Sequence, residues 1–231
     1  MLCYYGAHLF FHFSTTMNGT PMCNTPRLHL LIGDSIARDA GLHSRLRHDE
    51  VLNLAKGGAT WATTARDLDN IIDTWTTEAA GRGRRLGDVI IWITGNDVYK
   101  RHSARHNYNE AGLARCGAHA GVVCRRLLAR GGGVTLLGPL PRLSGDVTGS
   151  RWETTASYHL ERRLKHSLPP EVRLVQLGRQ LLRRTCGGYR VTAECAPAFR
   201  RDGVHLTAQG YARLAAAKAM PEWVAMTAAH R

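Results

Sequence analysis

The 231-residue sequence contains no run near the roughly 18 consecutive apolar residues that a membrane-spanning helix requires. Its six cysteines form no CxxC pair, which argues against a zinc site built on paired thiolates. The phosphate-loop pattern GxxxxGK(S/T) is missing, and the stretch GGGVT at residues 131–135 precedes an apolar run, on the wrong side for a phosphate cradle. These absences disfavour a helical membrane protein, a cysteine-based zinc protein and a phosphate-loop nucleotide binder.

Lysine is also scarce, with four residues against 27 arginines, and acidic residues number 18. The formal net charge is therefore +13. The arginines occur as pairs scattered over many segments rather than in one dense tract, a distribution that is typical of solvated helix faces. The charge suits contact with an anionic partner, but it predicts no particular nucleic-acid site.

The first 20 residues are apolar and aromatic, but no Lys or Arg precedes the apolar run, unlike in a secretory signal. We expect residues 1–25 to be a poorly structured leader and residues 26–231 to form one domain, a usual size for a single α/β core. The chain is expected to be soluble, with the cytoplasm favoured over secretion. Cys186 and Cys195 flank a loop that they could bridge under oxidising conditions. The cysteines therefore fit an oxidising and a reducing compartment alike.

Apolar runs alternate along the chain with segments of helical spacing. The run DVIIWIT is continuous, as expected for a central parallel strand covered on both faces. The expected strands are residues 27–32, 50–54, 88–94, 133–137 and 172–177. The expected helices run from Ser35 to about residue 47, and over residues 63–80, about 108–130, 151–168 and 207–220. Repeated β-then-α units with right-handed crossovers predict an α/β fold, a flavodoxin-like three-layer α/β/α sandwich with a five-stranded parallel sheet.

Two short segments carry residues suited to nucleophilic catalysis. Gly33-Asp34-Ser35 places a hydroxyl between a strand end and a helix start, although such a Ser also fits a helix N-cap. Asp202-Gly-Val-His205, on a turn leading into the last helix, can place a carboxylate beside an imidazole and hold its tautomer. A Ser after the first strand and an Asp-x-x-His after the last form a rare pair. Together they predict Ser35 as a nucleophile served by His205 and Asp202.

Two middle segments offer hydrogen-bond donors. In NLAKGGAT, residues 53–60, a glycine can bring a backbone N–H close to a substrate oxygen. In TGND, residues 94–97, the side-chain amide of Asn96 can donate to the same oxygen. Each segment alone fits a turn or a cap. Taken in this order they predict an oxyanion hole, in which deletion of one donor typically costs about 3–4 kcal/mol.

The four segments resemble the blocks of the SGNH (GDSL-type) hydrolases, which are named for the Ser, Gly, Asn and His that the blocks carry. GDS resembles the first block, NLAKGGAT the second, ITGND the third, and DGVHLTAQGYARLA closely matches the last. The resemblance implies a serine esterase in which Ser35 is the nucleophile, His205 the base and Asp202 its partner. It also implies an oxyanion hole made by the N–H groups of Ser35 and Gly58 and the amide of Asn96.

The resemblance extends from Leu28 to about Ala217, and the chain departs from the family pattern at three positions. Ile36 replaces the Leu of GDSL and Ala55 replaces the usual Gly of the second block. Thr94 stands where the third block commonly has Gly, so the turn before the expected oxyanion donor is expected to differ.

The resemblance further implies an acyl-enzyme mechanism that needs no metal and no organic cofactor. His102 and His106 lie four residues apart, but no third ligand is clearly placed with them.

Substrate choice is expected to depend on three basic, polar loops, at residues 98–109, 140–151 and 184–201. Their basic residues include Lys100, Arg101, Arg105, Arg142, Arg151 and Arg190. These loops favour an ester substrate with a short acyl group on a polar or anionic carrier over a long-chain lipid. The alternative is a non-catalytic SGNH-like binding module for an anionic polymer or nucleic acid. The presence of all the expected catalytic and oxyanion-hole residues argues against this alternative.

Overall fold

The computed structural model describes residues 25–99, 108–143 and 149–227, so nearly all of the expected leader lies outside the described part. At its centre is a five-stranded parallel sheet in the order β3-β1-β4-β5-β6. The strands are β1 (Arg27–Gly33), β3 (Glu50–Asn53), β4 (Arg85–Trp92), β5 (Val134–Leu137) and β6 (Arg173–Val175). This is the flavodoxin order, and it confirms the predicted fold class.

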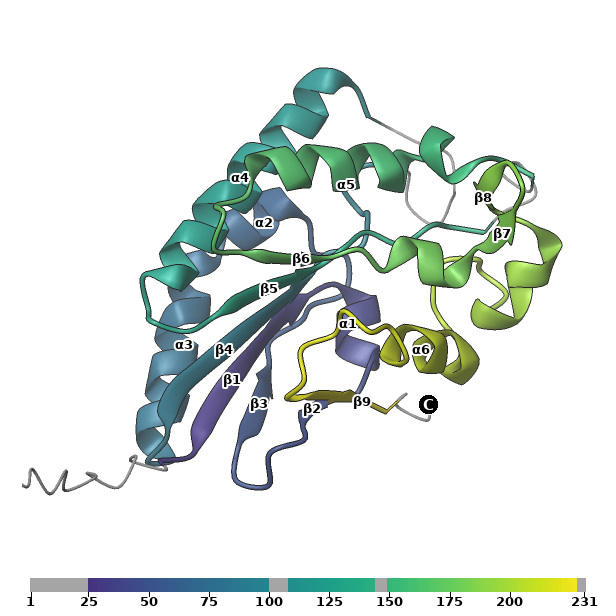
Figure 1. Cartoon of the computed structure of the whole chain (residues 1–231). Coiled ribbons are helices and arrows are strands. Elements are labelled where there is room, and N and C mark those ends of the chain that lie inside the picture. The colour runs from purple at the N-terminus through teal and green to yellow at the C-terminus, as the bar shows by residue number, and fades with distance from the viewer. Residues whose placement is uncertain (1–24, 100–107, 144–148, 228–231) are drawn as a thin grey trace, which may run out of the picture.

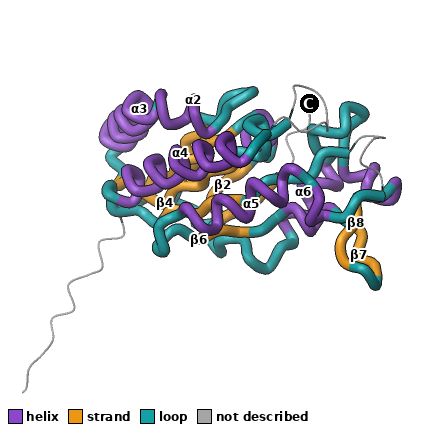
Figure 2. Tube along the Cα trace, turned by 90° about the horizontal axis from the view of Figure 1, so that it is seen from above, coloured by secondary structure: helices purple, strands orange, loops and turns teal. Residues whose placement is uncertain are grey.

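Helices cover both faces of the sheet and make three layers (Figure 1). One face packs against α2 (Trp61–Arg66), α3 (Leu68–Gly81), α4 (Glu110–Leu128) and α5 (Ala156–Ser167). The other face packs against α1 (Ser35–Asp39) and α6 (Ala208–Ala215). Figure 2 shows α4 and α5 running side by side over the strands.

The alternation of side chains along a strand explains why the sheet needs two apolar covers. In β1, Leu30 and Ile32 belong to the core on the α2–α5 side, whereas Leu31 belongs to the core on the α1 and α6 side. All three side chains are buried. The apolar run in β4 behaves in the same way, although this strand begins at Arg85 rather than at Asp88.

The helix expected from Ser35 to about residue 47 was too long. The helix α1 ends at Asp39, and the chain then turns at Gly41, whose φ is +58°. Residues Leu42–Ser44 form β2, which pairs antiparallel with β9 (Val224–Met226). Because this partner lies near the other end of the chain, local helical spacing could not reveal it.

Other helix boundaries also differ from the expectation. The segment expected as one helix over residues 63–80 is two helices, because α2 ends and α3 begins around Asp67. The last helix ends at Ala215, earlier than expected. The segment before α5 is a 3-10 turn, η2 (Trp152–Thr154), because Thr155 is extended and its side chain caps the helix.

The segment between β6 and α6, part of which was expected as a loop over residues 184–201, has regular elements. It contains the 3-10 helices η3 (Gly178–Leu181) and η4 (Ala193–Ala198) and a hairpin of β7 (Arg183–Thr185) and β8 (Gly188–Arg190). Cys186 is exposed at the turn of this hairpin, Cys195 is buried, and both thiols are free. Among the described residues, no helix has the length and apolar character needed to cross a bilayer.

Candidate active site

Ser35 stands at the carboxyl edge of the sheet, where β1 passes directly into α1. Asp34, and not the serine, is the N-cap of α1, and its Oδ1 accepts the Ile36 N–H at 2.9 Å. The chain reaches this point through Gly33, whose added Cβ would lie 2.3 Å from the Trp92 carbonyl oxygen. With the cap supplied by its neighbour, the half-buried Ser35 hydroxyl is left for another partner.

Asp34 ties the first sequence block to the third. Its buried Oδ2 accepts the N–H of Thr94 at 2.8 Å and the Thr94 hydroxyl at 2.6 Å. Burial raises the pKa of the Asp34 carboxyl, against the opposing effect of the hydrogen bonds from Thr94 and Ile36. The Thr94 hydroxyl, which a glycine would lack, therefore helps to join the ends of β1 and β4.

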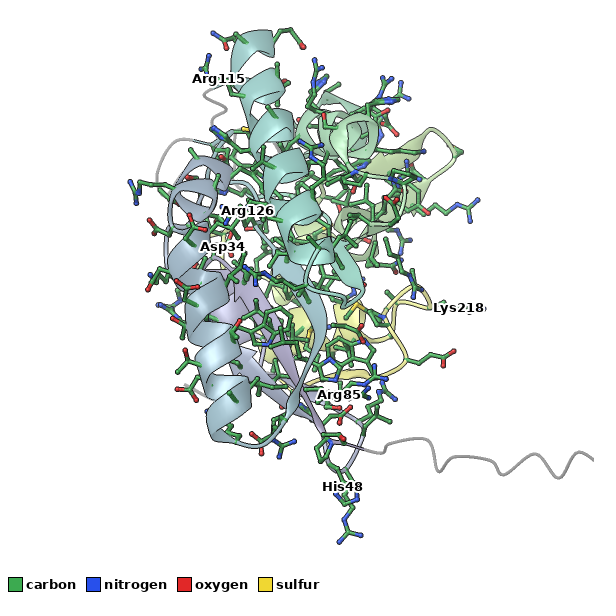
Figure 3. The ribbon with its side chains drawn as sticks, turned by 90° about the vertical axis from the view of Figure 1, so that its left-hand side faces the viewer. Asp34, His48, Arg85, Arg115, Arg126 and Lys218 are labelled. Carbon is green, nitrogen blue, oxygen red and sulfur yellow. The ribbon has the colours of Figure 1, made fainter. Side chains whose placement is uncertain are left out.

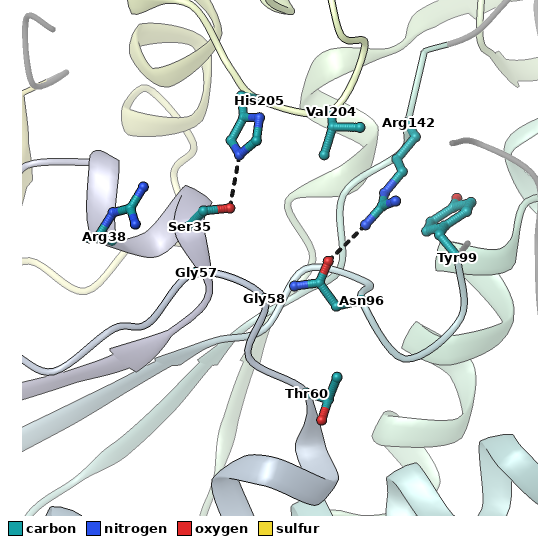
Figure 4. Close-up of a pocket in the computed structure, with 10 residues that line it drawn as sticks. All are labelled: Ser35, Arg38, Gly57, Gly58, Thr60, Asn96, Tyr99, Arg142, Val204 and His205. Atoms are coloured by element: carbon teal, nitrogen blue, oxygen red, sulfur yellow. Dashed lines mark hydrogen bonds between the residues drawn. The ribbon is translucent and has the colours of Figure 1, made fainter. Parts of the chain in front are cut away.

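A hydrogen-bonded chain links Ser35, His205 and Asp202. The Ser35 Oγ lies 2.9 Å from His205 Nε2 (Figure 4). On the other side of the ring, His205 Nδ1 lies 2.6 Å from Asp202 Oδ2. Partial burial raises the pKa of Asp202, but hydrogen bonds from the His205 ring and from the N–H groups of Val204 and His205 outweigh it, so the net pKa is lowered. The ionised carboxylate can only accept, so Nδ1 carries the proton and Nε2 is free to accept the serine proton.

The turn that carries His205 depends on Gly203. This glycine has a φ of +65°, and an added Cβ would overlap the Leu143 carbonyl oxygen at 1.6 Å. The Leu143 N–H donates to the Gly203 carbonyl at 2.7 Å, and the Arg200 N–H donates to the His205 carbonyl at 2.7 Å. The loop after β5 thus supports the histidine turn.

The predicted oxyanion donors line the same cavity as the serine and the histidine. This cavity has a volume of about 540 Å³, and its walls include Ser35, Gly58, Asn96 and His205. Gly58 has a φ of +77°, a conformation that favours glycine. The turn before it is held to β1 by the Lys56 N–H, which donates to the Gly33 carbonyl at 2.9 Å.

Asn96 is held through both ends of its amide. Its Nδ2 donates to the Ala59 carbonyl at 3.1 Å, and its Oδ1 accepts from Arg142 Nη2 at 2.9 Å. The next residue, Asp97, accepts the Trp61 N–H at 3.0 Å and so joins this turn to α2. Burial raises the pKa of Asp97 to about 6.

The structure adds cavity residues that the sequence did not single out. Arg38 lies one turn after Ser35 on α1, a spacing that could have revealed it, and Thr60, Tyr99 and Val204 also contribute to the lining. Arg142 was expected only as one basic residue of a substrate loop, whereas its side chain is buried in the cavity wall.

Two of the other loop residues expected to select the substrate lie outside the cavity lining. The backbone of Arg151 pairs in an antiparallel β-bridge with Arg190, the last residue of β8, and neither residue is among the cavity lining. The remaining expected residues, Lys100, Arg101 and Arg105, lie outside the described part of the chain, as do His102 and His106.

No protein-family model matches the sequence, and no curated protein sequence matches it. Solved structures do match its architecture. A lipase/acylhydrolase from Enterococcus faecalis is 18% identical, with a TM-score of 0.52 over 81% of this chain and 91% of that chain. A Parabacteroides merdae protein described as GDSL-like lipase is 13% identical, with a TM-score of 0.54 over 81% and 91%. The acetyl xylan esterase AlAXEase is 15% identical, with a TM-score of 0.54 over 80% and 93%. At such identities the likeness concerns architecture, and this chain has the fold of the SGNH (GDSL-type) hydrolases.

Proposed function

We propose that the protein is a serine esterase that hydrolyses a carboxylic ester through an acyl-enzyme. The observation that carries the proposal is the unbroken chain from Ser35 through His205 to Asp202 at the carboxyl edge of the sheet. His205 Nε2 takes the hydroxyl proton as Ser35 Oγ attacks the ester carbonyl carbon. The tetrahedral intermediate then loses the alcohol, which leaves with the proton from His205. Water attacks the acyl-enzyme with the same base, and a carboxylic acid and free Ser35 result.

The oxyanion hole of this proposal consists of the N–H groups of Ser35 and Gly58 and the Nδ2 of Asn96. As the first residue of α1, Ser35 has an N–H with no acceptor inside the helix. Asn96 uses one of its two Nδ2 hydrogens on the Ala59 carbonyl, and the second remains for a substrate oxygen. Fixed donors of this kind stabilise the negative charge that develops on the carbonyl oxygen in the transition state.

The charge of the cavity suggests the kind of ester. Among the described residues, the lining contains the guanidinium groups of Arg38 and Arg142 and no carboxylate. The Arg38 side chain is held in place by its neighbour, because its Nε donates to the buried Asp39 at 2.9 Å. A short acyl group on a polar or anionic carrier therefore suits the cavity better than a long-chain lipid. The similarly folded AlAXEase is named as an acetyl xylan esterase, that is, for an acetyl ester of a polysaccharide.

The test is hydrolysis of p-nitrophenyl acetate by the wild type and by Ser35→Ala. We expect the variant to lose about a thousandfold or more of the turnover, because His205 is left without the hydroxyl that it activates. Ser44→Ala, on the distant strand β2, is the matched control and should keep the wild-type rate. Equal rates in the wild type and in Ser35→Ala would overturn the assignment.

A further inference from the structure

Arg142 is a buried arginine beside the proposed oxyanion hole. It lies five residues after the end of β5, and 7% of its surface is exposed. Its Nη2 donates to Asn96 Oδ1 at 2.9 Å, and its guanidinium lies over the ring of Tyr99, 4.6 Å from the ring centre (Figure 4). The side chain therefore contacts the asparagine amide while an aromatic ring supports its charged plane.

The contact decides which way the Asn96 amide points. A guanidinium can only donate and a carbonyl oxygen can only accept, so Arg142 requires Oδ1 on its side and the Ala59 carbonyl requires Nδ2 on the other. Rotating the amide by 180° would place two donors together at Arg142 and two acceptors together at Ala59. Both hydrogen bonds would be lost, so the rotated amide is strongly disfavoured.

The position of Arg142 is fixed from several sides. The Tyr99 hydroxyl lies 3.0 Å from the Ser157 hydroxyl, and Ser157 Oγ donates to the Leu140 carbonyl at 2.5 Å. The Leu140 N–H donates to the Thr94 carbonyl at 3.2 Å, and Leu143 is held to Gly203. The loop that bears Arg142 is thus attached to the turn before Asn96 and to the turn before His205.

We propose that Arg142 is a positioning residue of the hydrolase, which acts through Asn96. It holds the amide so that the second Nδ2 hydrogen is directed to the developing oxyanion. By donating to Oδ1, the guanidinium also withdraws electron density from the amide and strengthens Nδ2–H as a donor. The inference rests on the proposed esterase function, and it assigns to Arg142 no direct contact with the reacting atoms.

A double-mutant cycle on p-nitrophenyl acetate hydrolysis tests this role, with Arg142→Ala, Asn96→Ala, the double variant and Ser35→Ala measured together. We expect Arg142→Ala to lower kcat by about 10- to 100-fold with little change in KM, because the lost interaction acts in the transition state. In the Asn96→Ala background, the same substitution should lower kcat by less than about threefold, because the amide on which it acts is gone.

Two further variants make the result interpretable. Arg142→Lys keeps a charged donor, so this variant should recover part of the lost kcat when Asn96 is present. In the Asn96→Ala background the lysine should recover none. If Arg142→Ala does not fold, Arg142→Lys takes its place in the cycle. Arg162→Ala removes another arginine that lies over a tyrosine, at 6.0 Å from the Tyr158 ring centre, and should leave kcat unchanged. Equal losses in both backgrounds, or no loss, would overturn the role of Arg142 while Ser35→Ala still abolishes turnover. Retained turnover in Ser35→Ala would instead overturn the proposed function.

Discussion

Two neighbouring positions in the second sequence block, Gly57 and Gly58, differ in how strongly their backbone conformation requires glycine. Gly58 has a φ of +77°, in the left-handed region, and no described residue other than its chain neighbours comes within 4 Å of its added Cβ. Gly57 has no positive φ, and its added Cβ would lie 3.3 Å from Arg38 Nη1, the flexible end of a half-exposed side chain. Backbone conformation, and not space, therefore makes glycine necessary at Gly58 alone.

This difference predicts unequal effects of Gly58→Ala and Gly57→Ala. Gly58→Ala should destabilise the fold by about 1–2 kcal/mol, the cost of a left-handed conformation for a residue with a Cβ. If its N–H belongs to the oxyanion hole, relaxation of the turn should also lower kcat at least about tenfold. Thermal unfolding and p-nitrophenyl acetate kinetics on both variants check this, and similar kcat losses at the two positions would contradict the choice of Gly58.

At the scale of an element, α5 brings a carboxyl group into the core. Glu161 faces the sheet with 2% of its surface exposed, and no hydrogen-bond partner contacts its buried Oε2 among the described residues. Gly138, just after β5, leaves space for this oxygen, because an added Cβ at this position would lie 3.0 Å from it. Burial raises the pKa of Glu161 to about 7, although Arg179 and Lys165 oppose the shift.

The raised pKa predicts a pH-dependent gain in stability from Glu161→Gln. The folded protein retains a proton that the unfolded chain releases near pH 4.5, so this group's favourable contribution is complete below about pH 4.5 and is lost as the pH rises through about 7. At pH 8.5 the neutral glutamine should raise the free energy of unfolding by about 1–3 kcal/mol, or Tm by several degrees.

The measurement is thermal unfolding of the wild type and Glu161→Gln at pH 8.5 and pH 4.5. The gain should disappear at the lower pH. Glu171→Gln, at an exposed glutamate before β6, serves as the control and should show no such pH-dependent gain. A Tm difference between Glu161→Gln and the wild type that is the same at both pH values would contradict the explanation.

At the scale of the whole molecule, the surface carries a large excess of positive charge. Figure 3 shows Arg115 and Arg126 on α4, Arg85 at the start of β4 and Lys218 after α6 projecting from different parts of the fold. Some arginines are paired, as Arg126 is with Asp69, but such exposed pairs contribute little to stability and leave the net charge of +13 unchanged. This dispersed charge is the basis for the alternative of a binding module.

The charge predicts weak, salt-sensitive binding of an anionic polymer. We expect a fluorescently labelled single-stranded oligonucleotide to bind at 50 mM salt and to lose more than about tenfold in affinity by 200 mM, because binding releases counterions. Ser35→Ala should bind equally well, since its charge is unchanged. Fluorescence anisotropy measures both, and an absence of binding at 50 mM salt would contradict an anionic partner.

The architecture and the meeting of the four blocks were predictable because they follow from local patterns and one geometric rule. Apolar runs separated by helical segments indicate parallel strands, and the carboxyl ends of such strands share one edge of the sheet. Ser35 and Asn96 follow two of these strands, while His205 precedes the last helix. The end of α1 and the pairing of β2 with β9 were not predictable, because they depend on a contact between distant parts of the chain.

The types of the candidate catalytic side chains, their order and their placement at one sheet edge were thus readable from residues close together in the sequence. The residues of other loops that hold Asn96 and the turn at Gly203 in place were not readable in this way. Arg142 reaches Asn96 from a loop 46 residues away, and Leu143 holds the turn at Gly203 because the loop after β5 lies against the turn before α6. Local spacing restricts the conformation of a few residues, whereas these contacts exist only after the packed layers have brought separate loops within hydrogen-bonding distance.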